Sequence, residues 1–154
     1  MATGDVTVFN EFTEDIGEEI HDFENDTIKL ALIDNTVTPL ADTATPQWGA
    51  GSSQDYDANE VSTAGGYTAN GETVAVTFTR TTDTSTLNDN SGDISLAQNG
   101  SGFTDAYWGI LYNDSAVNKN CIAFVELGGP VSEQAGPVNI NWNASGILTI
   151  QANA

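Results

Sequence analysis

Positive charge is the scarcest property of this sequence. The chain of 154 residues has 3 Lys and Arg against 22 Asp and Glu, which gives a formal net charge of −19. A protein this acidic cannot bind nucleic acid by neutralising phosphates, and it is repelled by an anionic membrane surface. We therefore predict neither kind of partner. The acidic side chains must be spread and hydrated, or held against a partner that supplies positive charge.

Cysteine, histidine and long apolar runs are also nearly absent. Cys121 is the only cysteine, so the chain has no internal disulfide and no cysteine metal site. His21 is the only histidine, and its acidic flanks predict an exposed surface residue. No apolar run approaches the ~20 residues of a membrane-spanning helix. The first residues have neither a basic region nor an apolar stretch, so no signal peptide is expected.

The sequence contains no recognisable catalytic fingerprint. It has no nucleophile elbow, phosphate-binding loop or dinucleotide motif, and its many carboxylates make any single acidic pair unspecific. We therefore predict that the protein is not an enzyme, with no catalytic residues, no bound metal and no cofactor.

Most of the chain has the period of two that is typical of strands. Apolar residues alternate in the segments 27–33 and 73–80, and further strands are expected at 93–97, 106–112 and 121–127, with a final hairpin of 138–142 and 146–151. The stretch 81–92 reads as a polar loop. The pattern predicts a mainly β protein, an antiparallel β-sandwich or jelly-roll-like domain with one short N-terminal helix. The expected core is Ile28, Leu30, Leu32, Val74, Val76, Phe78, Ile110, Tyr112, Ile122, Phe124, Ile140, Ile147 and Leu148.

The first 26 residues differ from the rest and are expected to form an acidic arm or helix ahead of the β domain at 27–154. Its apolar residues recur at helical spacing, with Asn10 as the expected N-cap. They are Phe9, Phe12, Ile16, Ile20 and Phe23. The stripe either packs on the domain itself or belongs to an arm that becomes ordered on a partner. We predict that it makes the main contact with the partner.

A long polar loop at 36–64 carries two aromatic residues, Trp48 and Tyr56. Loops of this length in compact domains are usually functional or poorly ordered. The two rings are therefore candidates for a partner contact, although folding back over the domain's own core is an equal alternative. The acids of residues 55–60 are oxygen ligands of the kind that Ca²⁺ uses. Their default interpretation is a solvated acidic loop, and we predict no metal site.

Four stretches in order resemble a known family. They are Asp26–Ile33, Gly65–Gly71, Gly109–Asp114 and Asn143–Ile150. Together they resemble small virion structural proteins of tailed bacteriophages, in which a D-T-x-K segment, a G-Y-T-x-x-G motif, an L-Y-N-D strand end and a G-x-L-T terminus follow one another. The resemblance covers nearly the whole chain outside residues 36–64 and 81–92.

The resemblance implies a capsid decoration, or cement, protein on the outside of the phage head. It implies the major capsid protein as partner, a homo-oligomer with a trimer favoured, and assembly in the cytoplasm of the bacterial host. The alternatives are a tail, connector or fibre-associated virion protein, or a β-sandwich module that binds Ca²⁺ or carbohydrate through Trp48, Tyr56 and the acids of residues 55–60.

Overall fold

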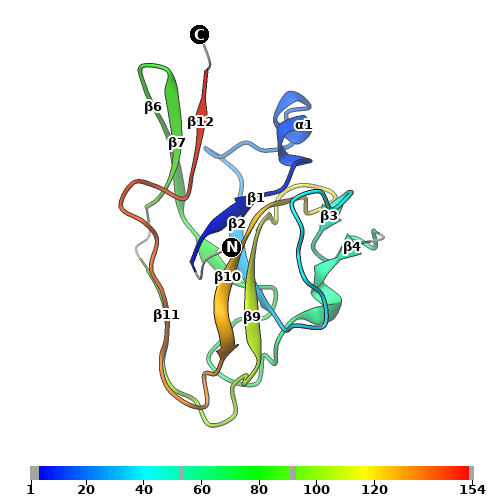
Figure 1. Cartoon of the computed structure of the whole chain (residues 1–154), viewed down its shortest axis with the longest axis vertical. Helices are drawn as coiled ribbons and strands as arrows, with labels where there is room; N and C mark the ends of the chain where they lie inside the picture. The colour runs from blue at the N-terminus through cyan, green and yellow to red at the C-terminus, as the bar shows by residue number, and fades with distance from the viewer. Residues whose placement is uncertain (1–3, 53, 91–92, 153–154) are drawn as a thin grey trace.

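The computed structural model describes residues 4–52, 54–90 and 93–152 and shows a mainly β protein built around one antiparallel sheet (Figure 1). The order of strands in this main sheet is β1-β10-β9-β2-β5. Their bounds are Val6–Val8 for β1, Cys121–Val131 for β10, Ala106–Asn113 for β9, Ile28–Ile33 for β2 and Glu72–Val74 for β5. The mainly β fold with antiparallel sheets and one helix is confirmed.

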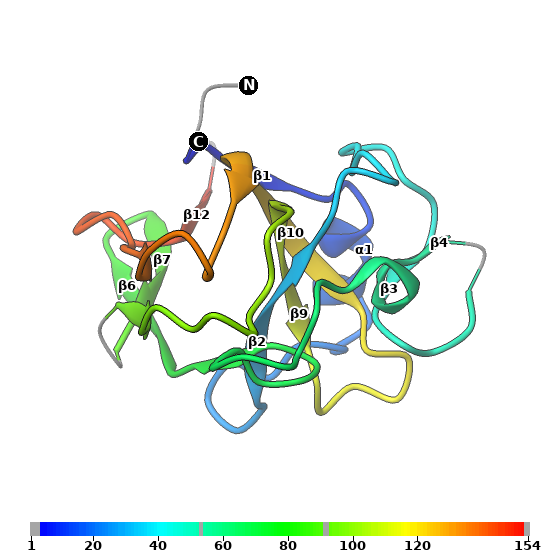
Figure 2. The ribbon, with the colours of Figure 1, turned by 90° about the horizontal axis from the view of Figure 1, so that it is seen from below.

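The second layer consists of two smaller antiparallel sheets that lie against one face of the main sheet (Figure 2). One is the pair β8 and β11, which span Ile94–Leu96 and Val138–Ile140. The other has the order β12-β7-β6, with β6 at Val76–Thr81, β7 at Thr84–Asp89 and β12 at Leu148–Gln151. In chain order β8 follows β7 and β12 follows β11, and the pairs β8–β11 and β7–β12 are both antiparallel.

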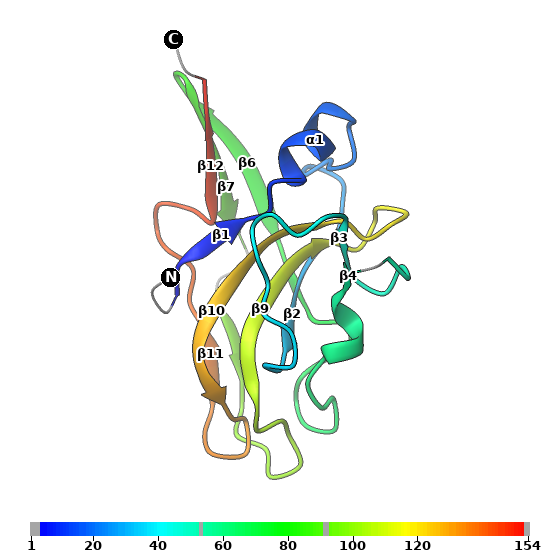
Figure 3. The same ribbon diagram turned by 45° about the vertical axis from the view of Figure 1, so that its right-hand side comes forward.

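The sheet of β6, β7 and β12 extends beyond the main sheet and has two unlike faces (Figure 3). The register places Phe78, Leu87 and Leu148 side by side on the inner face, with Arg80, Ser85 and Ile150 in the next row towards the tip. The outer face is polar because alternate residues point to opposite sides of a strand. It carries Thr77, Thr79, Thr81, Thr84, Thr86, Asn88, Thr149 and Gln151. We call these three strands the protruding sheet.

Both faces of the main sheet are covered by the protein itself. On one face Ile28, Leu30 and Leu111 pack against Leu87 and Leu148 of the second layer. The other face is covered by the long loop, which contains β3 (Pro46–Gln47), β4 (Gln54–Asp55) and the 3-10 helix η1 (Tyr56–Asn59). The central strands are therefore buried on both sides, and near-continuous apolar runs such as that of β2 are typical of this position.

The N-terminal segment joins this core instead of standing apart from it. Its β1 pairs antiparallel with β10, and the helix α1 spans only Phe12–Gly17. The prediction of one helix through the whole apolar stripe is wrong, because Glu19 has a φ of 60° and turns the chain out of the helix. The expected side-chain cap at Asn10 is also absent, since Glu11 occupies the N-cap position without a capping side-chain bond.

Three further expectations are corrected by the strand pairing. The stretch 81–92 contains β7 and is not simply a loop. The two C-terminal strands do not form a hairpin, because β11 pairs with β8 and β12 pairs with β7. Phe78 was expected in the core but is 43% exposed on the protruding sheet, and Val76 and Ile140 are only partly buried. None of the helices in the described part of the chain has the length and apolar character needed to span a membrane.

Candidate functional site: an apolar groove with an acidic rim

The seven predicted contact residues are divided between the core and the surface. Five of them are buried in this chain's own core, and these are Phe9, Phe12, Phe23, Trp48 and Tyr56. Ile16 is 40% exposed, and Ile20 is half-buried. The apolar stripe is therefore no free anchor, and the alternative in which it packs on the domain itself describes this structure.

Trp48 and Tyr56 cap the second face of the main sheet. The Trp48 indole stacks on Tyr112 with ring centroids 5.3 Å apart, and its Nε1 donates to the Asn70 side chain. Tyr56 packs against Phe9. The alternative in which the loop folds back over the core is confirmed, and the two rings offer no exposed contact surface. Their burial was weighed from the sequence, but loop composition alone could not decide it.

An open groove is lined by residues of the N-terminal segment and of the protruding sheet. Its volume is about 910 Å³. Phe78 and Ile150 from the sheet and Ile16 from α1 are exposed there by 43%, 36% and 40%. The buried Phe23 contributes to the lining and contacts Phe78 at a centroid distance of 5.6 Å. Three of the five large hydrophobic residues that are exposed in the described chain therefore gather in one groove.

The rim of this groove is acidic on the side of the N-terminal segment. Glu19, Asp22 and Glu24 line it and are exposed. Hydrogen bonds from the Asn25 side chain and from the Glu24 and Asn25 backbones lower the pKa of Asp22, so its carboxyl remains ionised. Arg80 lies one row beyond Phe78 towards the tip of the protruding sheet. The groove thus combines an apolar wall with a strongly negative opposite edge.

A buried polar cluster holds the N-terminal wall in place. The His21 side chain is fully buried between Phe12 and Phe23, so the prediction of a surface histidine is wrong. Its Nε2 lies 3.4 Å from the Asp15 carboxylate, and its Nδ1 lies 3.2 Å from the Asn113 amide nitrogen. Asn113 also donates to Asp26 and to the backbone of Ile20. One buried asparagine on β9 thereby fixes the segment that forms the groove's edge.

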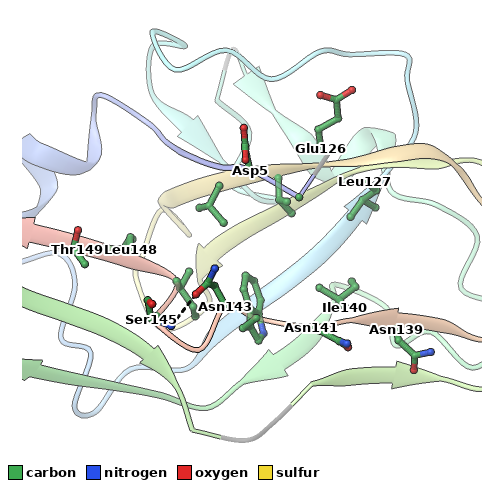
Figure 4. A pocket seen from close by; sticks show the side chains of 16 residues that line it. Asp5, Glu126, Leu127, Asn139, Ile140, Asn141, Asn143, Ser145, Leu148 and Thr149 are labelled. Carbon is green, nitrogen blue, oxygen red and sulfur yellow. Dashed lines mark hydrogen bonds between the residues drawn. The ribbon is translucent and has the colours of Figure 1, made fainter. Parts of the chain in front are cut away.

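A second cleft, with a volume of about 560 Å³, lies between the edge of the main sheet and the segment that joins β11 to β12 (Figure 4). Its sides carry Asn139, Asn141, Asn143 and Ser145, and Glu126 projects from β10 away from these asparagines. Trp142 also lines it, and its indole Nε1 is buried without a hydrogen-bond partner in the described chain. Its lining residues in the described chain include no Lys, Arg or His.

The acidic loop uses its carboxylates internally. Asp55 accepts hydrogen bonds from the backbone N–H groups of Gly49 and Gly51 at 2.5 and 2.6 Å, and it also accepts one from Asp57. Burial and the neighbouring Asp55 raise the pKa of Asp57. Among residues 4–52, 54–90 and 93–152, no group of three or more His, Cys, Asp or Glu side chains could hold a metal ion. Asp55 therefore shapes a loop in this structure.

The four motifs of the resemblance meet in and around the main sheet. Tyr67 donates to Glu60 and accepts from the Leu32 backbone, while Tyr112 donates to the Asn70 carbonyl. Gly71, with a φ of 88°, lies so close to the Leu30 carbonyl that no side chain would fit. Burial raises the pKa of both tyrosines, so they remain protonated donors. These contacts of Tyr67, Gly71 and Tyr112 therefore maintain the fold.

Comparisons of this chain with family models, with curated proteins and with solved structures find no match.

Proposed function

We propose that this protein is a structural component of a tailed-bacteriophage virion, a decoration protein bound through the major capsid protein to the outside of the head. The proposal rests on how the few basic residues of the chain are paired. Lys29 and Lys119 both bind Asp114, each at 3.1 Å, so two of the three basic residues neutralise one carboxylate. In the part of the chain that is described, Arg80 is the remaining cation and is exposed.

This arrangement leaves the surface almost purely anionic. Electrostatic complementarity therefore favours a basic partner, with fast association and strong salt dependence. The order of the four motifs supports a virion role, although the motifs themselves maintain the fold. Decoration of a symmetric shell further implies a symmetric oligomer, and a trimer is favoured because its axis matches the local three-fold positions of the shell.

The copy number in purified virions tests the proposed position. Quantitative mass spectrometry should find hundreds of copies per particle if the protein decorates the head. A few dozen copies or fewer would instead identify a tail, connector or fibre-associated protein, which is the second candidate. Absence of the protein from virions would reject both virion roles.

A Ca²⁺- or carbohydrate-binding module is the remaining alternative. The burial of Trp48 and Tyr56 removes the residues on which a carbohydrate site was hypothesised, and Asp55 already accepts backbone hydrogen bonds. Calorimetry with Ca²⁺ and with neutral oligosaccharides separates the classes. Measurable heat at micromolar concentration would favour the module, whereas no heat is expected of the decoration protein.

A further inference from the structure

We infer that the groove between the N-terminal segment and the protruding sheet receives a segment of the major capsid protein that carries apolar side chains flanked by Lys or Arg. This inference rests on the proposed function, because it names the surface and the chemistry through which the capsid would be bound. It assigns the contact to Ile16, Phe78 and Ile150 in place of the buried aromatic residues predicted from the sequence.

We infer that the bound segment carries apolar side chains, because the main sheet covers only part of the inner face of the protruding sheet. The inner face of the protruding sheet continues the core outward from Leu87 and Leu148, which are buried, to Phe78 and Ile150, which are not. The main sheet covers Leu87 and Leu148. Phe78 lies in the same row but on the edge strand β6, where its ring contacts only that of Phe23 among the ring pairs of the described chain, and Ile150 lies one row further towards the tip. Side chains supplied by a partner would bury the exposed side chains of Phe78 and Ile150, as anchor residues are buried in protein interfaces.

The charge of the occupant follows from the opposite edge. Glu19, Asp22 and Glu24 face the groove, and the described chain offers them no salt bridge within 4.0 Å. Burying apolar surface beside three carboxylates is favourable when the incoming segment neutralises them, and Arg or Lys at its flank does so. A second copy of this chain is disfavoured at the groove, because it would bring another −19 charge towards the same rim.

Arg80 determines the orientation in which the segment of the partner binds in the groove. It lies on the inner face at the tip, one row beyond Phe78, whereas the acids line the opposite side of the groove. A segment that placed its basic residues at the tip would meet Arg80 and be repelled. The basic flank therefore lies along the N-terminal segment, and the end near Arg80 is neutral or acidic.

Two substitutions test the groove, with binding to purified heads assembled without this protein as the measurement. Phe78→Ala should weaken binding about tenfold or more, because it removes the central anchor. Its control is Val117→Ala, which truncates a side chain that is 97% exposed and lies outside the groove. Glu24→Lys should slow association and flatten its salt dependence. The control for this charge change is Asp105→Lys, an exposed residue that does not line the groove.

The outcomes separate this inference from the proposed function. Unchanged binding by Phe78→Ala and Glu24→Lys, beside tight binding by the unmodified protein, overturns the groove and leaves the decoration role standing. Failure of the unmodified protein to bind heads overturns both. Sedimentation provides a further check, because loss of an oligomer in Phe78→Ala with unchanged binding to heads would mean that a second copy occupies the groove, which also overturns the inference. Melting curves of all four variants confirm that each is folded.

Discussion

The main sheet and the protruding sheet are built from similar strands but complete their cores differently. The central strands of the main sheet have both faces covered, by the second layer on one side and by the loop around Trp48 on the other. The protruding sheet has a polar outer face and an inner face that is covered only near its base. The first region is closed by the chain itself, whereas the second leaves apolar surface in contact with solvent.

This difference indicates where a binding surface lies in a protein whose aromatic residues are mostly buried in its own core. The large aromatic side chains of the loop and of the N-terminal stripe are buried in the closed region. Exposed apolar side chains that gather in one place are informative, because single exposed ones are normal. Ile16, Phe78 and Ile150 satisfy this criterion only in three dimensions, since they come from distant parts of the sequence.

Truncating one phenylalanine in each region gives the largest contrast. Phe124→Ala removes a buried ring of the main sheet and should lower the free energy of unfolding by about 3–5 kcal/mol. Phe78→Ala should cost less than about 1 kcal/mol, since this ring is already 43% exposed. Urea denaturation measures both values. Equal losses would show that the protruding sheet is as closed as the main sheet.

The sequence predicted the closed region well because its signals are local. Alternation in residues 27–33 and the apolar run at 106–112 placed β2 and β9 within one residue of their ends. The burial of Ala31 and Ile33 was not predicted, because it depends on a loop that folds back over the second face of the main sheet. A period of two identifies strands but does not say how many of their faces are covered.

The protruding sheet and the groove were predicted poorly, because their structure depends on pairing between strands that are far apart in the sequence. Phe78 alternates as a core residue should, yet its strand extends past the end of the main sheet. The Thr- and Asn-rich sequence of β7 resembles a loop, and only pairing with both neighbours makes it a central strand. His21 lacks any sequence signal of burial, since its partner Asn113 is far away in the chain.

Removing the buried polar contact between the main sheet and the N-terminal segment is the next largest effect. Asn113→Ala should cost about 2–3 kcal/mol, because Asp26, His21 and the Ile20 carbonyl lose a shared buried partner. Hydrogen exchange should also accelerate in residues 9–26, which form the acidic edge of the groove. Asn88→Ala on the protruding sheet is the matched control and should cost less than about 1 kcal/mol. An Asn113 variant as stable as this control would show that the N-terminal segment is held by its apolar contacts alone.

The pair of lysines on Asp114 gives a smaller effect that depends on pH. Burial by itself would raise the pKa of Asp114, but hydrogen bonds and charges from Lys119 and Lys29 lower it overall. Because the folded-state pKa is lowered, this stabilisation is present above the unfolded pKa near 3.8 and is lost as the pH falls through the folded value. Asp114→Asn should cost about 1 kcal/mol at pH 7 and progressively less as the pH falls below 3.8. Denaturation at both pH values measures this, with exposed Asp105→Asn as the control.

The smallest effect concerns Glu60, which belongs to the loop that closes the main sheet. Burial is the largest influence on this carboxyl and raises its pKa above 4.5, although hydrogen bonds from Tyr67 and Asn70 act against the rise. A raised folded-state pKa means that the contribution of Glu60 to stability is fully present below the unfolded pKa and declines as the pH rises through the folded value. Glu60→Gln keeps an acceptor oxygen for both donors without the buried charge. At pH 7 its free energy of unfolding should be the same as that of the unmodified protein, or higher by less than about 1 kcal/mol. It should also lack the decline in stability that the unmodified protein shows as the pH rises above 4.5. A variant that is clearly less stable at pH 7 would show that the ionised carboxylate's hydrogen bonds outweigh the cost of its burial, and that the closed region depends on this charge.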